Sequence, residues 1–393
     1  MKEWIKISDL LFFQEGPGVR NTQYTQSGVK LLNVANLVNG KVDLSTSDRY
    51  ISEDEAFGRY KHFLCDDGDF IIASSGIKVE YFDKKMGFVD SSMLPLCMNT
   101  STIRFKVIDS ERLNIKYFMY YLKSLHFKQQ LSKFITGSAQ LNFGPSHLKK
   151  MNMPLVSLKE QNDIVEKLSK VELLLDKYNG EIKLLDELIK ARFVEMFGNP
   201  RINPMNFNKS ELKDTCDIIT GNTPSRKNEE YYGNYIEWIK TDNIVVNKLN
   251  PTYAKESLSK EGMDVGRTVD KNCILMACIA GSISSIGRVC VTDRKVAFNQ
   301  QINAIVPKKY NCMFLYVLMQ VSKDYLVDGI NMALKGILSK SRLEEKQFIV
   351  PPLELQNQFA SFVQEIDKSR SRIEKSLEAS QELFDSLMQE YFG

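Results

Sequence analysis

The sequence predicts an α+β protein in which two α/β domains alternate with two long helices that pack together as an antiparallel coiled coil. Three observations predict this fold class: a long internal repeat, a coiled-coil pattern of apolar residues in each copy of the repeat, and two looser copies of a strand-rich region before the helices. The predicted boundaries are 1–155 for the first domain, 156–198 for the central helix, 199–350 for the second domain and 351–393 for the carboxyl-terminal helix.

The long repeat has two anchors. The segment LKEQN at 158–162 reappears as LELQN at 353–357, and Phe197-Gly198 reappears as Phe392-Gly393, so that both pairs are 195 residues apart. No insertion or deletion separates the anchors, and apolar positions coincide between them. The two segments are therefore predicted to be copies of one helix, each ended by a glycine with an aromatic residue packed beneath it.

Each copy has the spacing of a coiled-coil seam. In the first copy, apolar residues alternate at intervals of four and three, which is typical of a helix that packs along a partner helix. The predicted seam residues are Ile164, Leu168, Val171, Leu175, Tyr178, Ile182, Leu185 and Ile189 in the first copy and Phe359, Val363, Ile366, Ile373, Leu377 and Phe384 in the second. Arg370 and Ser380 interrupt the second seam. Because the first helix leads into the second domain, the second helix covers its seam most simply by folding back, which predicts a pseudo-two-fold internal repeat.

The regions before the helices repeat more loosely. One pair of segments predicts a strand followed by a polar turn, a second predicts a buried strand that runs into a turn of small residues, and a third predicts a short amphipathic helix. These pairs are 29–37 with 236–244, 67–76 with 270–281, and 117–122 with 313–318. A helix of about 36 residues is roughly 54 Å long at ~1.5 Å per residue. That length predicts a spacer that holds the two domains apart by between one and two turns of B-DNA, at about 34 Å per turn.

Composition limits the class of protein without deciding it. With 393 residues, 43% of them hydrophobic and 26% charged, the chain suits a folded protein of at least two domains. The net charge of +3 neither demands nor excludes a nucleic-acid partner. Seven cysteines without a CxxC pair, no apolar stretch of membrane-spanning length and no signal peptide together predict a cytoplasmic protein with core thiols and no membrane partner.

Catalytic motifs are missing. The chain has three histidines, and Ser146-His147 are adjacent in a way that does not by itself create a nucleophile and base. No phosphate-binding loop, dinucleotide fingerprint, HExxH or paired CxxC occurs, and Val350-Pro351-Pro352-Leu353 lacks the flanking residues of an amino-methyltransferase motif. We therefore expect no catalysis, no bound cofactor and no metal in this chain.

Several loops have the composition of DNA-reading segments. Arginine and amide side chains read base edges, while glycine and serine let backbone NH groups approach phosphates. The candidate DNA-binding residues are Arg20, Asn21, Ser74, Ser75, Lys78, Ser138, Gln140 and Asn142 in the first domain and Thr223, Ser225, Arg226, Lys227, Ser282, Arg288, Asn299, Gln300 and Lys335 in the second. Each loop has the alternative of an ordinary solvated turn. Asn299-Gln300-Gln301 has a further alternative, in which the amides pin the loop to its own backbone.

This organisation resembles the specificity subunit of type I restriction-modification systems. The resemblance covers the whole chain and is carried by 351–356 (PPLELQ), its counterpart 154–161, the two Phe-Gly endings and 297–301 (AFNQQ). The first domain has Met98-Asn99-Thr100-Ser101 where the second has the Asn-Gln run. The resemblance implies two target recognition domains that each read half of a split double-stranded DNA target. It also implies two modification subunits that bind the helices and methylate adenine with S-adenosylmethionine, with restriction subunits as further partners.

Two other classes of function stay open from the residues alone. A coiled-coil scaffold for protein assembly would use the helices for docking without binding DNA. A self-contained nuclease or methyltransferase is disfavoured by the missing motifs.

Overall fold

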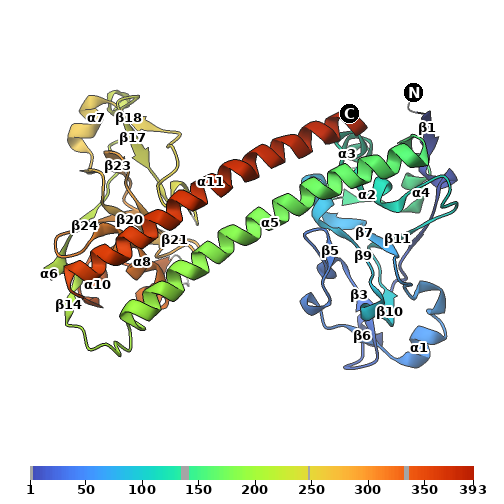
Figure 1. Ribbon diagram of the computed structural model, residues 1–393, viewed down its shortest axis with the longest axis horizontal. Helices are drawn as coiled ribbons and strands as arrows, with labels where there is room; N and C mark the ends of the chain where they lie inside the picture. Colours follow the sequence, from blue (N-terminus) through green and yellow to red (C-terminus); the bar gives the residue numbers. More distant parts are fainter. Residues whose placement is uncertain (1–2, 134–140, 247, 332–335) are drawn as a thin grey trace. The chain divides into compact units, whose positions relative to one another are not determined.

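The computed structural model describes residues 3–133, 141–246, 248–331 and 336–393 (Figure 1). The chain divides into two compact units. Unit 1 consists of Met1–Lys177 and Leu377–Gly393, and unit 2 of Tyr178–Ser376. Each unit therefore contains one globular domain together with part of both long helices, α5 (Leu158–Phe197) and α11 (Leu353–Phe392).

The first domain, in unit 1, is built on a four-stranded antiparallel sheet of order β2-β11-β7-β9. These strands are β2 (Leu11–Glu15), β11 (Thr102–Val107), β7 (Phe70–Ala73) and β9 (Met86–Phe88). A three-stranded sheet contains β10 (Leu96–Met98), β3 (Val29–Leu32) and β6 (Tyr50–Ile51). Three two-stranded sheets are formed by β1 (Glu3–Lys6) with β13 (Asn152–Leu155), β8 (Ser75–Ile77) with β12 (Leu141–Asn142), and β4 (Leu37–Val38) with β5 (Lys41–Val42). The shorter helices are α1 (Glu53–Phe57), α2 (Ile115–Lys123), α3 (Leu125–Ser132) and α4 (Pro145–Leu148).

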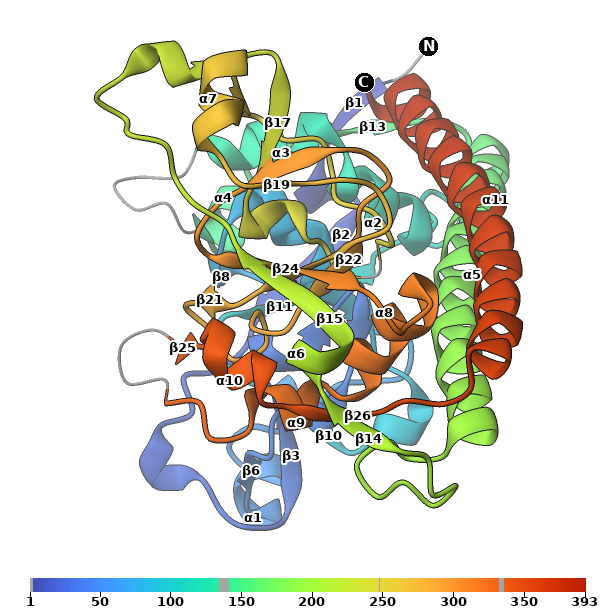
Figure 2. The ribbon, with the colours of Figure 1, turned by 90° about the vertical axis from the view of Figure 1, so that its left-hand side faces the viewer.

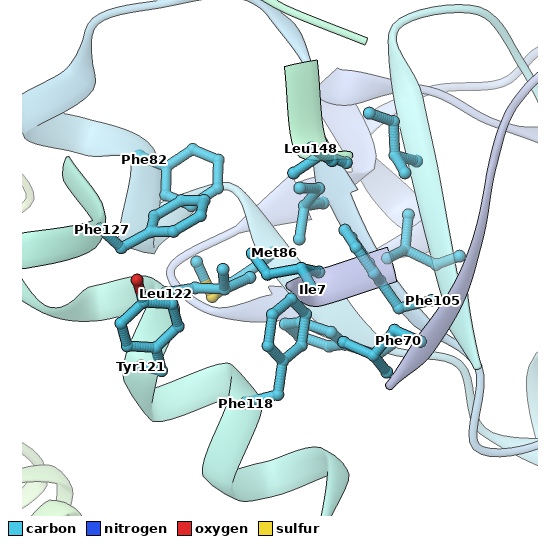
Figure 3. Packing of buried hydrophobic residues seen from close by; sticks show 14 of the residues in the cluster. Ile7, Phe70, Phe82, Met86, Phe105, Phe118, Tyr121, Leu122, Phe127 and Leu148 are labelled. Carbon is cyan, nitrogen blue, oxygen red and sulfur yellow. The ribbon is translucent and has the colours of Figure 1, made fainter. Parts of the chain in front are cut away.

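The core of unit 1 lies between the central sheet and α2 (Figure 3). The side chain of Asn114 caps α2 by accepting a hydrogen bond from the amide of Lys116. The buried face of α2 places the ring of Phe118 at 5.0 Å from Phe105 and 6.3 Å from Phe70, measured between ring centroids. All three rings are 0–1% exposed, so the amphipathic helix predicted at 117–122 covers this sheet.

The second domain, in unit 2, has a four-stranded sheet of order β15-β24-β20-β22. Its strands are β15 (Cys216–Thr220), β24 (Ile302–Pro307), β20 (Ile274–Ala277) and β22 (Val289–Val291). A five-stranded sheet contains β16 (Tyr232–Gly233), β18 (Ser257–Leu258), β17 (Ile236–Ile239), β23 (Val296–Phe298) and β19 (Thr268–Val269). Two two-stranded sheets are formed by β14 (Lys209–Glu211) with β26 (Gln347–Ile349) and by β21 (Ile279–Ala280) with β25 (Gly336–Ile337). The shorter helices are α6 (Leu212–Thr215), α7 (Lys260–Val265), α8 (Cys312–Val321), α9 (Lys323–Val327) and α10 (Lys340–Glu344).

The two domains repeat one topology, as the sequence predicts. Taken in chain order, β2, β7, β9 and β11 of the first domain correspond to β15, β20, β22 and β24 of the second, and the two sheets have matching strand orders. The predicted strand-then-turn segments are β3 and β17, each followed by a 3-10 turn. The predicted buried strands are β7 and β20, in which every residue is buried. The predicted α+β fold class with an internal repeat is therefore confirmed.

The long helices pack antiparallel within each unit. In unit 1, Leu168 near the start of α5 and Phe392 at the end of α11 belong to one core. In unit 2, Phe193 and Phe197 near the end of α5 lie 5.5 Å from the ring of Phe359 near the start of α11. Every predicted seam residue is buried or half-buried.

The predicted helix endings and core thiols are also present. Gly198 has a φ of +70°, the left-handed conformation that ends helices, while Phe197 and Phe392 are buried. The seven cysteines form no disulfide, and all are buried except the half-buried Cys312. Burial raises the pKa of Cys278 to about 12. Within the described ranges, none of the helices has an apolar stretch that would let it cross a membrane.

Candidate nucleic-acid interface

Three polar loops of the second domain leave the central sheet at the same edge. Thr220 at the end of β15 pairs with Asn303 near the start of β24, and Ala277 at the end of β20 pairs with Ile302. Because both neighbours run antiparallel to β24, the loops after β15 and β20 and the loop before β24 gather there. We call this the loop edge of the second domain; it comprises 221–228, 278–288 and 299–301. Strand β21, which belongs to the second of these loops, pairs with β25 on the side of the domain away from α11 (Figure 2).

The first domain has an equivalent loop edge. Glu15 at the end of β2 pairs with Ile103 of β11, and Ala73 at the end of β7 pairs with Thr102. The loop edge of the first domain therefore comprises 16–21, 74–78 and 99–101. The sequence predicts polar loops, and the strand order brings them together in both domains.

Exposed candidate side chains of the second domain occupy all three of its loops. They are Thr223, Ser225, Arg226 and Lys227 in the first loop, Ser282 in the second and Gln300 in the third. The hydroxyl of Thr223 donates a hydrogen bond to Oε1 of Gln300, which joins the first loop to the third. This contact links two loops that are far apart in the sequence.

Arg226 is held in a fixed direction. Its guanidinium lies 4.4 Å from the ring centroid of Tyr232 and 5.2 Å from that of Trp238, and its Nη2 donates to Oε2 of Glu256 at 2.6 Å. Lys240 also donates to Glu256, and these two cations hold the pKa of that carboxyl below its usual value. Because both cations share one carboxylate, one positive charge is left over in this cluster.

Candidate residues of the first domain are arranged in two ways. Arg20, Asn21 and Lys78 are exposed, and Nζ of Lys78 lies 3.6 Å from a carboxylate oxygen of Glu80. Ser74 is only 1% exposed, and Ser75 is half-buried with its Oγ donating to Ser101 Oγ at 2.7 Å. The three exposed residues are therefore accessible to a ligand in this conformation, whereas Ser74 is not.

Two candidates of the second domain face their own protein. Arg288 precedes β22 at the loop edge, but its half-buried side chain lines a cavity bounded by α5 and α11. Asn299 is 6% exposed, and its side chain donates to Gln301 Oε1 at 3.2 Å and accepts from the Gln301 amide at 3.1 Å. This geometry is that of the alternative in which the amides pin their own loop.

Some candidates cannot be placed. Ser138, Gln140 and Lys335 lie outside the described residues. Asn142 belongs to β12, where its backbone pairs with Ser75.

Two glycine–asparagine contacts were missed from the sequence. A Cβ built on Gly16 would lie 2.0 Å from the carbonyl oxygen of Asn99, and one built on Gly221 would lie 2.1 Å from that of Asn299. Each glycine thus lets the first loop approach the third, and Asn99 occupies in the first domain the position of Asn299 in the second. The common signal is a glycine directly after β2 or β15. The fixed 195-residue offset did not reveal it because the connecting loops differ in length.

We expect Gly221→Ala to destabilise unit 2 by about 1–3 kcal/mol, because the new Cβ would overlap a backbone oxygen that cannot move without disturbing β24. Gly281→Ala is the matched control, since a Cβ there has no atom within 4 Å. Chemical unfolding of both variants measures the difference. Equal stability of the two variants would contradict the close approach of the loops.

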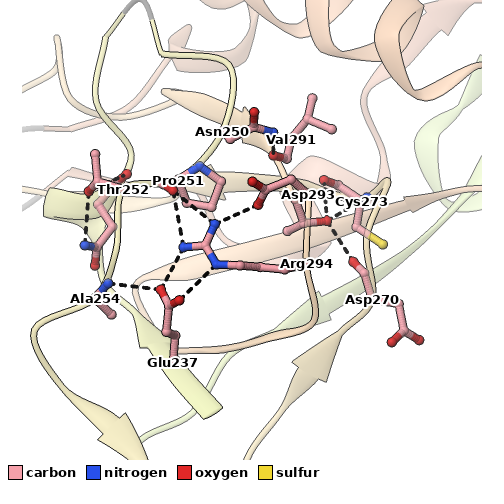
Figure 4. Close-up of polar contacts among 12 residues, drawn as sticks. Glu237, Asn250, Pro251, Thr252, Ala254, Asp270, Cys273, Val291, Asp293 and Arg294 are labelled. Atoms are coloured by element: carbon pink, nitrogen blue, oxygen red, sulfur yellow. Dashed lines mark hydrogen bonds and ion pairs between the residues drawn. The ribbon is translucent and has the colours of Figure 1, made fainter.

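A polar cluster of the second domain is centred on Arg294 and Glu237 (Figure 4). Arg294 donates from Nε to Glu237 Oε1 at 2.9 Å and from Nη2 to Glu237 Oε2 at 2.7 Å, and the Ala254 amide donates to the same carboxylate at 3.0 Å. Burial alone would raise the pKa of Glu237, but the bonds from Arg294 and Ala254 outweigh it and lower the pKa. These groups satisfy one another, so the cluster is structural. Across the described part of the chain, no three His, Cys, Asp or Glu side chains converge as metal ligands would.

Comparison with known proteins identifies the class to which this fold belongs. The model of the type I restriction modification DNA specificity domain matches residues 2–185 and again 204–382. The chain therefore belongs to the type I restriction-modification DNA specificity family, with one match for each half of its repeat.

Individual relatives are more distant. The MjaVIII specificity subunit of Methanocaldococcus jannaschii is 25% identical over 211 residues, which cover 52% of this chain and 48% of the relative. The HindI specificity subunit of Haemophilus influenzae is 31% identical over 158 residues, which cover 39% of this chain and 33% of the relative. The matched region thus spans about half or less of these two relatives.

Solved structures share the fold. The type I restriction-modification S subunit from M. genitalium aligns over 100% of this chain and 96% of its own, with a TM-score of 0.61 and 15% identity. A chain from a structural study of complex assembly and conformational transition in the type I system aligns over 100% of this chain and 97% of its own, with a TM-score of 0.50 and 15% identity.

Proposed function

We propose that this chain is the DNA specificity subunit of a type I restriction-modification complex and that it binds double-stranded DNA through the two loop edges. The observation that carries the proposal is the gathering of three polar loops at one edge of the central sheet in each domain. Exposed Arg20 and Lys78 in one domain and Arg226 and Lys227 in the other supply positive charge for phosphates. Neighbouring amide and hydroxyl side chains supply hydrogen bonds for base edges.

The target is proposed to be bipartite and asymmetric. Equivalent positions of the two loop edges carry different side chains: Thr100 follows the pinned asparagine in the first domain, and Gln300 follows it in the second. An amide can form a bidentate pair with adenine, whereas a hydroxyl accepts several bases. Different side chains at equivalent positions would therefore read different half-sites.

Partners are proposed to dock on the long helices. Leu173 and Leu184 of α5 are 70% and 62% exposed, although both are large apolar residues on an ordered helix. Such residues favour burial against another protein. We infer that two modification subunits bind there, carry S-adenosylmethionine and methylate adenine, with restriction subunits as further partners. The specificity chain itself is proposed to be non-catalytic and cytoplasmic.

Exchange of the second domain tests the assignment. The chain is co-expressed with its neighbouring modification subunit, and adenine methylation is mapped across genomic DNA by single-molecule sequencing. Replacing residues 199–350 with the corresponding domain of a relative is expected to change one half of the methylated motif and to leave the other half unchanged. A methylation pattern that does not depend on this chain would favour the coiled-coil scaffold instead.

Lys227→Met removes one positive charge from the loop edge of the second domain and so tests whether that edge binds DNA. We expect weaker binding of the complex to all DNA sequences and a slope of log affinity against log salt that is smaller by about 1, because one phosphate contact is lost. Lys295→Met is the matched control: Lys295 is also exposed, but it lies beyond the end of β22 at the opposite edge of the sheet. Binding titrations at several salt concentrations measure both slopes. An equal change in the two variants would contradict the proposed interface.

A further inference from the structure

Unit 2 contains a cavity where the second domain meets the two long helices. Its volume is roughly 210 Å³, and its walls come from α5, α8, α9, α11, the start of β22 and three apolar residues, Val245, Val246 and Leu249. One wall is apolar and is formed by Ile189, Val245 and Leu249 together with Val363. Gly287 and Arg288, at the end of the second loop of the loop edge, line the cavity, but none of the exposed candidate side chains of that edge does.

The other wall of the cavity is cationic. Four basic and two acidic side chains line it: Lys190, Arg288, Lys323, Arg370, Asp186 and Asp367. Asp186 already pairs with one of these cations, because its Oδ1 accepts a hydrogen bond from Nη2 of Arg370. Asp367 is the one other acidic side chain in the lining, against four basic ones, and burial raises its pKa. The cavity therefore has an excess of positive charge.

Two arginine side chains in this wall each have one buried donor atom without a hydrogen-bond partner. Arg370 is 7% exposed, and its Nη1 has no hydrogen-bond partner; Nε of Arg288 is likewise buried without one. Among the described residues, no carboxylate forms an ion pair with Arg288. Burial and the nearby charge of Arg288 lower the pKa of Lys323, whose Nζ donates a hydrogen bond to the backbone carbonyl oxygen of Ser284 at 2.6 Å. A buried donor that stays unpaired is costly, which points to a missing acceptor.

The repeat provides an internal comparison. At the 195-residue offset, Glu172 and Leu175 of α5 take the places of Asp367 and Arg370. In the corresponding cavity of unit 1, Lys123 Nζ donates to Glu172 at 2.5 Å and Lys128 Nζ donates to Asp83 at 3.0 Å. Three basic and three acidic side chains line that cavity, so their charges balance. The excess charge in unit 2 is a property of that copy alone.

We propose that the cavity of unit 2 is a binding site for a small oxyanion such as inorganic phosphate, held by Arg288, Lys323 and Arg370. The anion would accept hydrogen bonds from all three side chains and would neutralise the Arg288–Lys323 pair. The apolar wall would exclude water and strengthen this attraction. Since Arg288 belongs to the second domain and Arg370 to α11, the bound anion would join that domain to the helix.

Equilibrium dialysis of the full chain with its modification subunit against labelled inorganic phosphate tests this site. Ionic strength is kept constant with chloride, and DNA is left out, so that only a free anion can occupy the cavity. We expect one saturable site per specificity chain, and we expect Arg288→Met to weaken it at least tenfold (about 1.4 kcal/mol). Arg288 forms no ion pair among the described residues, so this variant should fold normally, which the fluorescence of Trp238 checks. Lys323→Met is a second variant with the same expected loss.

Lys84→Met is the matched control, because Lys84 lines the equivalent cavity of unit 1 and the substitution removes the same charge. Phosphate binding should be unchanged in that variant. The proposal would be overturned if the wild-type complex showed no saturable site, or if both Arg288→Met and Lys323→Met bound phosphate as tightly as the wild type. A loss of equal size in the Lys84→Met control would also overturn it, because the binding would then be non-specific.

Discussion

Replacing Phe359 with alanine is expected to destabilise unit 2 by about 3–5 kcal/mol, the usual cost of removing a fully buried phenylalanine ring. Phe359 is 0% exposed. Its ring lies 5.5 Å from Phe193 and from Phe197 at the end of α5, and 6.3 Å from Phe314 of α8. Because one side chain of α11 contacts the other long helix and the domain at once, its loss leaves a cavity that neither neighbour can fill alone.

Tryptophan fluorescence can follow this change in one unit. The chain has two tryptophans, Trp4 in unit 1 and Trp238 in unit 2. Trp4 is 47% exposed, so Trp4→Phe gives a background in which denaturant unfolding of unit 2 is read from the buried Trp238. Phe362→Ala is the matched control, since Phe362 lies on the same helix but is only half-buried. If both alanine variants lost the same stability, Phe359 would not be the central contact of the helix pair.

The long helices could be predicted from the sequence because both of their signals are local and repeated. The apolar spacing depends only on residues within one helix, and the 195-residue offset reports the same spacing twice. Even the interruption at Arg370 is visible in the sequence. Its partner is not visible, because Asp186 contacts it only when the helices pair in antiparallel register.

The loop edges could be predicted only in part. The composition of the loops at Arg20, Lys78 and Arg226 indicates candidate DNA contacts, but the strand order that gathers these loops involves residues that are far apart in the sequence. The direction of a side chain is harder still. Arg288 follows a glycine in a polar loop, as a DNA-reading residue would, yet the packing of β22 against α8 turns it toward the helices. Which of the exposed residues contact DNA stays a prediction.

Asp186→Gln is expected to destabilise unit 2 by about 3 kcal/mol, the lower end of the cost of removing one partner from a buried ion pair. Arg370 is 7% exposed and has Asp186 as its hydrogen-bonded carboxylate, so the substitution leaves a buried cation without its counter-ion. The lower end applies because the side chain of Asp186 is 25% exposed, which lets water reach the pair.

The repeat itself supplies the rescue for this variant. At the 195-residue offset, Leu175 takes the place of Arg370, and Gln381 takes the place of Asp186. Adding Arg370→Leu to Asp186→Gln therefore installs the uncharged residues that occupy these positions in the other copy, and we expect the double variant to regain most of the lost stability. Arg370→Leu alone should cost less than Asp186→Gln alone, because the remaining carboxylate is partly solvated whereas the remaining guanidinium is not. Unfolding in phosphate-free buffer, followed by Trp238 in the Trp4→Phe background, measures all three variants. If the double variant were no more stable than Asp186→Gln alone, the residues of the other copy would be unable to replace the Arg370–Asp186 ion pair at this point of the seam.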